Sequence, residues 1–165
     1  MRALGLDPGS ALTGYGVVEG RGNRLYHIAH GVIRTSAALP MHKRLHKIYT
    51  EVTELFSIYH PDAVAIEKLY FKQNVSTGIA VAQARGILLL AAAQADCHVG
   101  EFSPTEMKVA VTGYGRAEKR QVQEMVKRLL NLDACPKPDD AADGLALAIC
   151  QIQIGIVQQR IQTSK

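Results

Sequence analysis

Acidic residues end two apolar runs of the chain, and a third group of acids opens its last helical stretch. Asp7 ends the first run, Glu67 ends a later one, and the third group is Asp139-Asp140-Ala141-Ala142-Asp143. Within that group, Asp140 and Asp143 are i and i+3, so they share one face of a helix. Carboxylates that converge without Cys or His partners repel one another. They favour a hard divalent ion with oxygen ligands, Mg²⁺ or Mn²⁺.

A cluster of this kind supports phosphoryl transfer. Two metal ions about 3.5–4 Å apart clamp the attacking and leaving oxygens of an in-line displacement. The sequence therefore predicts two Mg²⁺ ions in one site, for which Mn²⁺ is expected to substitute. One ion would lie between Asp7 and the third group and activate a water. The other would lie near Asp7 and Glu67 and stabilise the leaving oxygen.

Each acid also has a purely structural interpretation. Asp7 precedes Pro8-Gly9 and could be a turn residue. Asp139 or Asp140 could cap a helix, and Asp143 is favourable in a first helical turn. Glu67 is harder to explain in this way, because strands disfavour Glu. A purely structural interpretation must explain each acid separately, although the topology brings them all together. It is therefore weaker for the group than for any single acid.

The elements that must position these acids follow from hydrophobic periodicity and turn residues. Strands are expected over residues 4–7, 14–19, 25–34, 63–67 and 97–102. Helices are expected over residues 44–59, 76–94, 104–111, 116–130 and 139–157. The order predicts an α/β fold with a mixed sheet of about five strands, the first three antiparallel, and helices on both faces. A right-handed crossover would place the strand of Glu67 beside that of Asp7, with both acids at the edge where α/β sheets bind ligands.

Length and composition fit one soluble domain. The 165 residues are 47% hydrophobic, contain no Trp and leave no long linker, so residues 1–165 are expected to form one domain with a frayed tail at 158–165. The uncharged stretch over residues 86–95 is too short to span a bilayer. No signal peptide is evident, and the three scattered cysteines predict reduced thiols and a cytoplasmic location. A net charge of +4 is consistent with a polyanionic partner but can also serve solubility.

Basic and aromatic residues near the acids predict contacts with nucleic acid. The segment 68–74, directly after Glu67, interleaves lysines with Tyr70 and Phe71, which suits base stacking and phosphate contact, although either ring could belong to the core. Cations around the start of the 116–130 helix are unfavourable for the helix dipole unless they share an anion. A solvated helix face is the alternative. The predicted DNA-binding residues are Tyr70, Lys72, Asn74, Arg85, Lys108, Arg116, Lys119 and Arg120.

Several motifs resemble the RuvC family of Holliday-junction resolvases. They are Leu6-Asp7-Pro8-Gly9-Ser10, Ala65-Ile66-Glu67-Lys68-Leu69-Tyr70, Gln83-Ala84-Arg85-Gly86 and Asp140-Ala141-Ala142-Asp143-Gly144. They occur in the family's order from residue 2 to about 155. The resemblance implies an RNase H-like fold and a homodimer that makes paired, Mg²⁺-dependent nicks at four-way DNA junctions in recombination and repair. It also implies a branch-migration partner of the RuvA/RuvB type, although no exposed apolar stripe in the sequence marks a dimer face.

The resemblance also implies roles for individual residues. The catalytic and metal-binding acids carried over by motif are Asp7, Glu67, Asp140 and Asp143, which leaves Asp139 as a helix cap. Lys119 is a candidate to neutralise charge on the phosphate, and Lys108 is a second lysine of the active site and DNA surface. Tyr70 takes the place of an aromatic residue that wedges against the bases of the junction, while Phe71 is expected in the core.

Two other functions are compatible with parts of the pattern. An acid and glycines after a first strand also begin the ATP-binding fold of actin and Hsp70. That fold needs a second phosphate loop, for which Asp143-Gly144 is the only later candidate. The nuclease fold could instead act on RNA, although short RNases of this kind generally lack the aromatic and basic segment after Glu67.

Overall fold

Five strands form one mixed sheet in the computed structural model, which describes residues 1–69 and 75–163. The strands are β1 (Arg2–Asp7), β2 (Leu12–Arg21), β3 (Arg24–Arg34), β4 (Ala63–Glu67) and β5 (His98–Phe102). Their order across the sheet is β3-β2-β1-β4-β5. β2 is antiparallel to β1 and β3, while β4 is parallel to β1 and β5. The predicted α/β class and the predicted pairing of the Asp7 and Glu67 strands are confirmed.

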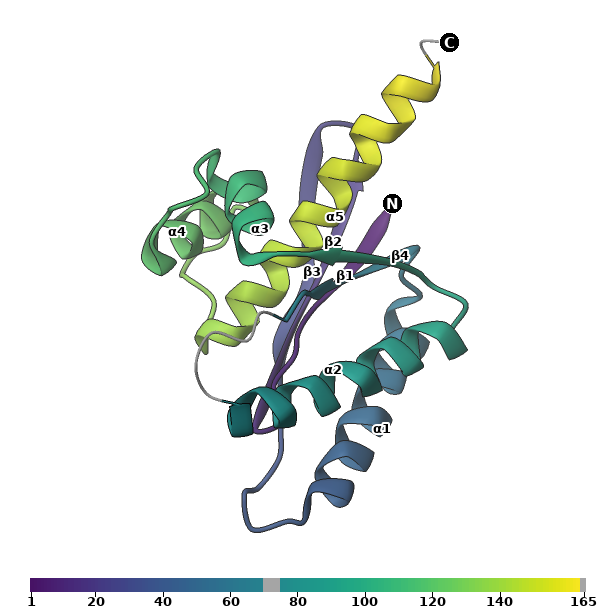
Figure 1. The fold of residues 1–165 in the computed structure, drawn as a ribbon. Helices are drawn as coiled ribbons and strands as arrows, with labels where there is room; N and C mark the ends of the chain where they lie inside the picture. The colour runs from purple at the N-terminus through teal and green to yellow at the C-terminus, as the bar shows by residue number, and fades with distance from the viewer. Residues whose placement is uncertain (70–74, 164–165) are drawn as a thin grey trace.

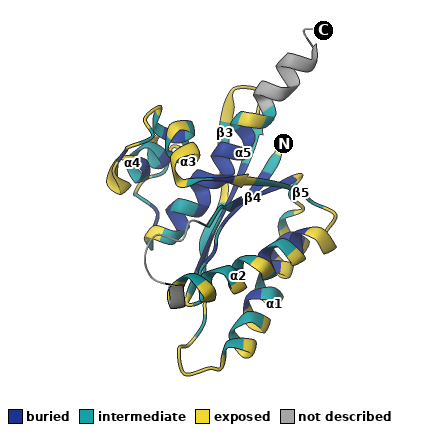
Figure 2. Cartoon of the chain, viewed as in Figure 1, coloured by how far each residue is buried: buried dark blue, intermediate teal, exposed yellow. Residues whose placement is uncertain are grey.

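Helices cover both faces of this sheet. They are α1 (Met41–Tyr59), α2 (Val75–Gln94), α3 (Pro104–Thr112), α4 (Lys119–Leu129) and α5 (Asp139–Thr163). α1 and α2 lie together on one face, and α5 crosses the other face with α3 and α4 beside it (Figure 1). The sheet therefore separates two apolar cores, and the most buried parts of the chain are the inner strands and the adjoining part of α5 (Figure 2).

Three helix boundaries differ by three residues or more from the sequence-based expectation. α1 begins at Met41 rather than at residue 44. α4 begins at Lys119 rather than at residue 116, because the backbone N–H of Glu118 donates to Oε1 of Gln121 at 2.8 Å and fixes the start of the helix there. Arg116 consequently lies before the helix and not in its first turn. α5 continues to Thr163 rather than ending at residue 157.

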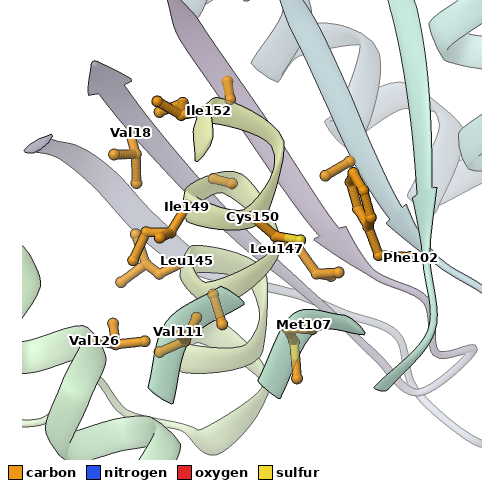
Figure 3. Packing of buried hydrophobic residues seen from close by; sticks show 14 of the residues in the cluster. Val18, Phe102, Met107, Val111, Val126, Leu145, Leu147, Ile149, Cys150 and Ile152 are labelled. Carbon is orange, nitrogen blue, oxygen red and sulfur yellow. The ribbon is translucent and has the colours of Figure 1, made fainter. Parts of the chain in front are cut away.

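The two faces of the sheet differ in the size of their side chains. The α1/α2 face carries large aliphatic residues from alternate positions of β1 and β4, namely Leu4, Leu6, Val64 and Ile66. The α5 face carries Ala3 and Ala65 from the positions between them. Figure 3 shows α5 packed between sheet residues such as Val18 and Phe102 and helix residues such as Val111 and Val126. Small strand residues let this helix approach the sheet closely.

Glycines bring the approach of α5 to backbone contact. A Cβ atom added at Gly14 would lie 1.9 Å from the carbonyl oxygen of Asp140, and one at Gly5 would lie 2.0 Å from that of Gly144. Gly14 is also the residue that pairs with Asp7 across β1 and β2. The first turn of α5 therefore lies directly against the strand end that carries Asp7. The space beside Gly14 is filled by the first turn of α5.

One helix in the described residues, α2, is long and apolar enough to span a membrane by length and composition, over Thr77–Gln94. The uncharged stretch considered in the sequence, residues 86–95, covers only part of this span, because the charged Arg85 lies directly before it. One side of the helix, including Ala84 and Leu88, is buried against α1 and the sheet. Its apolar character is therefore explained in part by core packing.

We expect Gly14→Ala to displace the first turn of α5, because its Cβ has no room beside the Asp140 carbonyl. Overpacking of this kind costs about 1–3 kcal/mol. The variant should therefore show a lower free energy of unfolding in urea. The matched control is Gly86→Ala, whose Cβ meets nothing within 4 Å and which lies inside a helix. It should be neutral or slightly stabilising. Equal stability of the two variants would contradict the packing role of Gly14.

Candidate functional site

Asp7 and Glu67 lie side by side at one end of the sheet. β1 and β4 are parallel, and their register pairs Leu6 with Ile66 as the last partners before the two acids. Side chains alternate between faces along a strand, so Asp7 and Glu67 both point away from the α1/α2 core that contains Leu6 and Ile66. They face α5, and their carboxyl groups share a hydrogen bond. The predicted meeting of these two acids is found in the structure.

The first turns of α5 bring further acids to the same place. Asp140 and Asp143 are half-buried, and both raise the pKa of Asp7 through their negative charge. Asp140 reaches this position because its backbone lies against Gly14, the cross-strand partner of Asp7. Four carboxylates from three separate elements thus surround one end of the sheet.

The electrostatics of this end favour a bound cation. Burial raises the pKa of Asp7 to about 8, with further contributions from Glu67, Asp143 and Asp140. Burial also raises the pKa of Glu67 and of Asp143, although the neighbouring Lys119 acts in the opposite direction on both. A single ammonium group leaves most of the negative charge uncompensated at neutral pH. A divalent ion would restore the ionised state of the buried carboxylates.

Asp139 and Asp140 are distinguished by their surroundings. Asp139 is exposed, with 58% of its side chain accessible, and its Oδ2 lies 3.5 Å from Nζ of Lys119. The same Nζ lies 3.2 Å from Oδ2 of Asp143. The negative charge of Asp140 contributes to the raised pKa of Asp7. This arrangement supports Asp140 as the acid of the site and gives Asp139 a contact with Lys119.

The donor set fits Mg²⁺ held by pairs of carboxylates. Within residues 1–69 and 75–163, no three His, Cys, Asp or Glu side chains stand close enough to ligate one ion together. Mg²⁺ commonly takes only one or two protein carboxylates and completes its shell with waters and substrate phosphates. The all-oxygen surroundings of Asp7 meet that requirement, and Glu67 on one side and the α5 acids on the other offer two such pairs.

Three further basic residues lie on or directly before the helices α3 and α4. Lys108 lies on α3, Arg116 lies before α4 and Arg120 lies in its first turn. Arg116 and Arg120 are exposed, Lys108 is half-buried, and none of the three forms an ion pair with another described residue. They remain available for phosphate contact. Of the other predicted DNA-binding residues, Tyr70, Lys72 and Asn74 lie outside the described residues, as does Phe71.

Two predicted DNA-contact residues have partners within the protein. Lys119 lies between Asp139 and Asp143, as described above. Arg85 donates to the backbone carbonyl of Glu67 and pairs with Glu101. The sequence did not indicate Glu101 as its partner. The signal that could have suggested one is that Arg85 is the only charged residue in the sequence of α2, where an unpaired charge would be costly.

Comparison with known proteins identifies close relatives. A family model described as "Crossover junction endodeoxyribonuclease RuvC" matches residues 3–151. The protein of that name from Thermosipho melanesiensis is 54% identical over 150 residues, which cover 91% of this chain and 96% of the relative. The one from Rubrobacter xylanophilus is 54% identical over 147 residues, covering 89% and 82%.

Solved structures agree with these sequence relatives. Thermus thermophilus RuvC superposes with a TM-score of 0.85 at 34% identity, covering 94% of this chain and 97% of that one. The T. thermophilus RuvC in complex with Holliday junction substrate gives a TM-score of 0.87 at 30% identity, covering 95% and 96%.

We expect Asp7→Asn to stabilise the metal-free protein, by an amount that grows with pH. The pKa of Asp7 is about 8 in the folded protein, against an ordinary value of 3.8 for an aspartate. Its protonated form therefore contributes stability that is fully present below about pH 4 and is lost as the pH rises through about 8. Asn is neutral throughout. In thermal unfolding with EDTA, the Tm of the variant should rise relative to the Tm of the wild type between pH 5 and pH 8. A pH-independent difference would contradict the raised pKa.

Proposed function

The chain belongs to the RuvC family of crossover junction endodeoxyribonucleases, and on that premise we propose that it resolves four-way DNA junctions with a two-metal site. It is an RNase H-like nuclease that acts on Holliday junctions in recombination and repair. The observation that carries the site assignment is the convergence of Asp7, Glu67, Asp140 and Asp143, with the pKa of Asp7 raised to about 8. The relatives named above are DNA-junction nucleases, so neither an ATP-binding nor an RNA-processing role is favoured.

The family implies dependence on a divalent metal, and the proposal assigns two Mg²⁺ ions to each site, with Mn²⁺ as a substitute. Asp7 and Glu67 would hold one ion, and the other would lie between Asp7 and the α5 acids Asp140 and Asp143, with waters and substrate phosphate completing each shell. When bound, such ions supply an activated water and a stabilised leaving oxygen. Asp7 belongs to both pairs, because it is the acid that all the others surround.

The chain's own residues would hold the metal ligands in place and neutralise charge on the phosphate. Glu67 and Asp7 are fixed to strand ends, so their oxygens are held in place by the sheet and cost little reorganisation. Lys119 keeps its ammonium group beside Asp143, where it can approach a phosphate oxygen and offset part of the charge that develops there. Burial around Asp7 lowers the local dielectric and strengthens each of these interactions.

The DNA surface of the proposal extends from the acids over α3 and α4. Lys108, Arg116 and Arg120 offer positive charge on one side of the acids, which suits a phosphate backbone. Stacking by Tyr70 and polar contacts from Lys72 and Asn74 remain predictions from the resemblance. Such contacts would place the scissile phosphate beside Asp7 without reading base identity.

The proposal includes a homodimer, and α2 supplies a face for it. Ile79 and Leu90 on this helix are 53% and 48% exposed, respectively. A long apolar helix with exposed large side chains is typical of an interaction surface. Two copies would each carry one four-acid site, which suits paired nicks on symmetry-related strands. The proposal also takes residues 1–165 as one domain, places the protein in the cytoplasm and retains a RuvA/RuvB-type partner from the resemblance.

Cleavage of a synthetic four-way junction tests the function. With Mg²⁺, the wild type should nick the junction in opposed strands and leave linear duplex and structured RNA largely intact. Asp7→Asn, Glu67→Gln, Asp140→Asn and Asp143→Asn should each lower cleavage by about 10³-fold or more, because an ion loses a ligand. Junction binding in Ca²⁺ should persist.

Asp139→Asn is the matched control for these four variants. It removes the same charge from the same helical turn but leaves the acids around Asp7 intact, so cleavage should fall no more than a few-fold. Wild-type cleavage by any of the four acid variants would remove that residue from the site. Equal loss in Asp139→Asn would show that general charge, and not ligation, determines activity.

Leu90→Glu should give a monomer, because it places a charge in the apolar face of α2 without touching the buried core. Light scattering on a sizing column measures the mass. Cleavage should change from paired to single nicks, while metal binding persists. Ile58→Glu is the control, since Ile58 is 63% exposed on α1 and borders a surface pocket that also contains Val32 and Ile33 of β3. A dimer that survives Leu90→Glu would exclude this face as the interface.

A further inference from the structure

Arg85 has an unusual environment for a residue expected to bind DNA. It is the single charged residue in the sequence of α2, and only 19% of its side chain is exposed. A guanidinium that is mostly removed from water requires partners, or its burial is costly. Both of its partners are at the carboxyl ends of neighbouring strands, next to the proposed metal centre.

The two partners are a backbone carbonyl and a carboxylate. Nε of Arg85 donates to the carbonyl oxygen of Glu67 at 3.0 Å. A terminal nitrogen of the same guanidinium pairs with the carboxylate of Glu101 on β5. The planar guanidinium can serve both acceptors at once, which a lysine could not do with the same geometry. Arg85 thus ties the end of β4 to the edge strand β5 and to α2.

Glu67 is paired with Phe102 of β5 but lies where the pairing of β4 with its other neighbour, β1, has ended. The pairing of β4 with β1 ends at Ile66 and Leu6, so no β1 residue is paired with Glu67. On the β5 side, the next backbone N–H, that of Lys68, donates to the carbonyl of Phe102 at 2.8 Å. A backbone carbonyl at a strand end must find a donor, and Arg85 supplies it. The peptide on the carboxyl side of Glu67 is therefore held at both its oxygen and its nitrogen.

We propose that Arg85 is a positioning residue that fixes the backbone of Glu67 and thereby holds its carboxylate beside Asp7 for metal binding. This inference rests on the proposed function. The Glu67 side chain faces α5, whereas Arg85 reaches the backbone from α2 on the other face of the sheet. Arg85 therefore acts without touching the metal or the scissile phosphate. Repulsion between Glu67 and the other acids would displace an untethered strand end, which is why the tether matters.

A DNA contact by Arg85, which the sequence predicted, would have different measurable consequences from a positioning role. A phosphate contact would require the guanidinium to leave Glu67 and Glu101, and it would contribute to junction affinity with or without metal. A positioning residue instead changes metal affinity and leaves junction affinity in EDTA unchanged. The two roles therefore separate in measurements that do not depend on cleavage.

The experiment measures Mn²⁺ binding to the full chain by electron paramagnetic resonance, and junction binding in EDTA by fluorescence anisotropy. Arg85→Ala should weaken Mn²⁺ binding at one site by about 10–100-fold, as supporting residues of metal sites commonly do. The Mn²⁺ affinity of Arg85→Lys should lie between those of Arg85→Ala and the wild type. Glu101→Gln should have a smaller effect, because the bond from Nε to the Glu67 carbonyl remains. Hydrogen exchange of the peptide containing Lys68 should be faster in Arg85→Ala.

Leu88→Ala is the matched structural control. Leu88 is fully buried on the same helix, in the core beneath the sheet, so its truncation should lower Tm at least as much as Arg85→Ala. Mn²⁺ affinity of the folded control should stay at the wild-type value. If Leu88→Ala weakens Mn²⁺ binding to the same degree, loss of stability explains the effect and the positioning role is overturned.

Other outcomes also decide the proposal. Wild-type Mn²⁺ affinity in Arg85→Ala, or in Arg85→Lys if the alanine variant fails to fold, would overturn it. So would a loss of junction affinity in EDTA with a reduced salt dependence, which would establish a DNA contact. If the wild type binds Mn²⁺ but does not cut the junction, the proposed function fails while the role of Arg85 in metal binding is still measured.

Discussion

Backbone contact between α5 and the β1–β2 hairpin is the constraint on which the site depends. Gly5 and Gly14 have no side chain to separate the helix from the strands, and the carbonyls of Gly144 and Asp140 occupy the space where their Cβ atoms would be. Because Gly14 is the cross-strand partner of Asp7, this contact also fixes how near the α5 acids come to Asp7. The apolar core beneath α5, which includes Leu145, Leu147 and Ile149 of that helix, stabilises the placement (Figure 3).

Close packing of the acids has an electrostatic cost in the absence of a cation. Burial and like charge raise the pKa of Asp7 to about 8, so the metal-free fold holds a group that resists ionisation at neutral pH. Active sites commonly retain such unfavourable arrangements because function requires them. Lys119 relieves part of the repulsion at Asp143, and its exposed ammonium group still leaves the site open to a phosphate. Metal binding and DNA binding are thereby directed to the same small region.

The strands and the meeting of Asp7 with Glu67 could be predicted because they follow from local pattern and a handedness rule. The apolar runs are short and end in acids, and a right-handed crossover makes their strands neighbours. The predicted start of α4, at residue 116, was wrong by about one turn. The hydrogen bond between Glu118 and Gln121 begins the helix at Lys119, although the helical sequence pattern extends to earlier residues. The contacts of Gly14 and Arg85 join segments far apart in the chain, and no local periodicity indicates them.

The two halves of the site are held by different cores. Asp140 and Asp143 are carried by α5 and depend on the core between α5, α3 and α4. The backbone of Glu67 is held from the other face, by Arg85 on a helix whose buried residues belong to the α1/α2 core. Asp7 lies on the strand shared by both. If α2 also forms the dimer face through Ile79 and Leu90, then one rigid helix connects the partner subunit to Glu67. Assembly of the dimer and placement of one metal ligand would then depend on the same element, while the α5 acids would not.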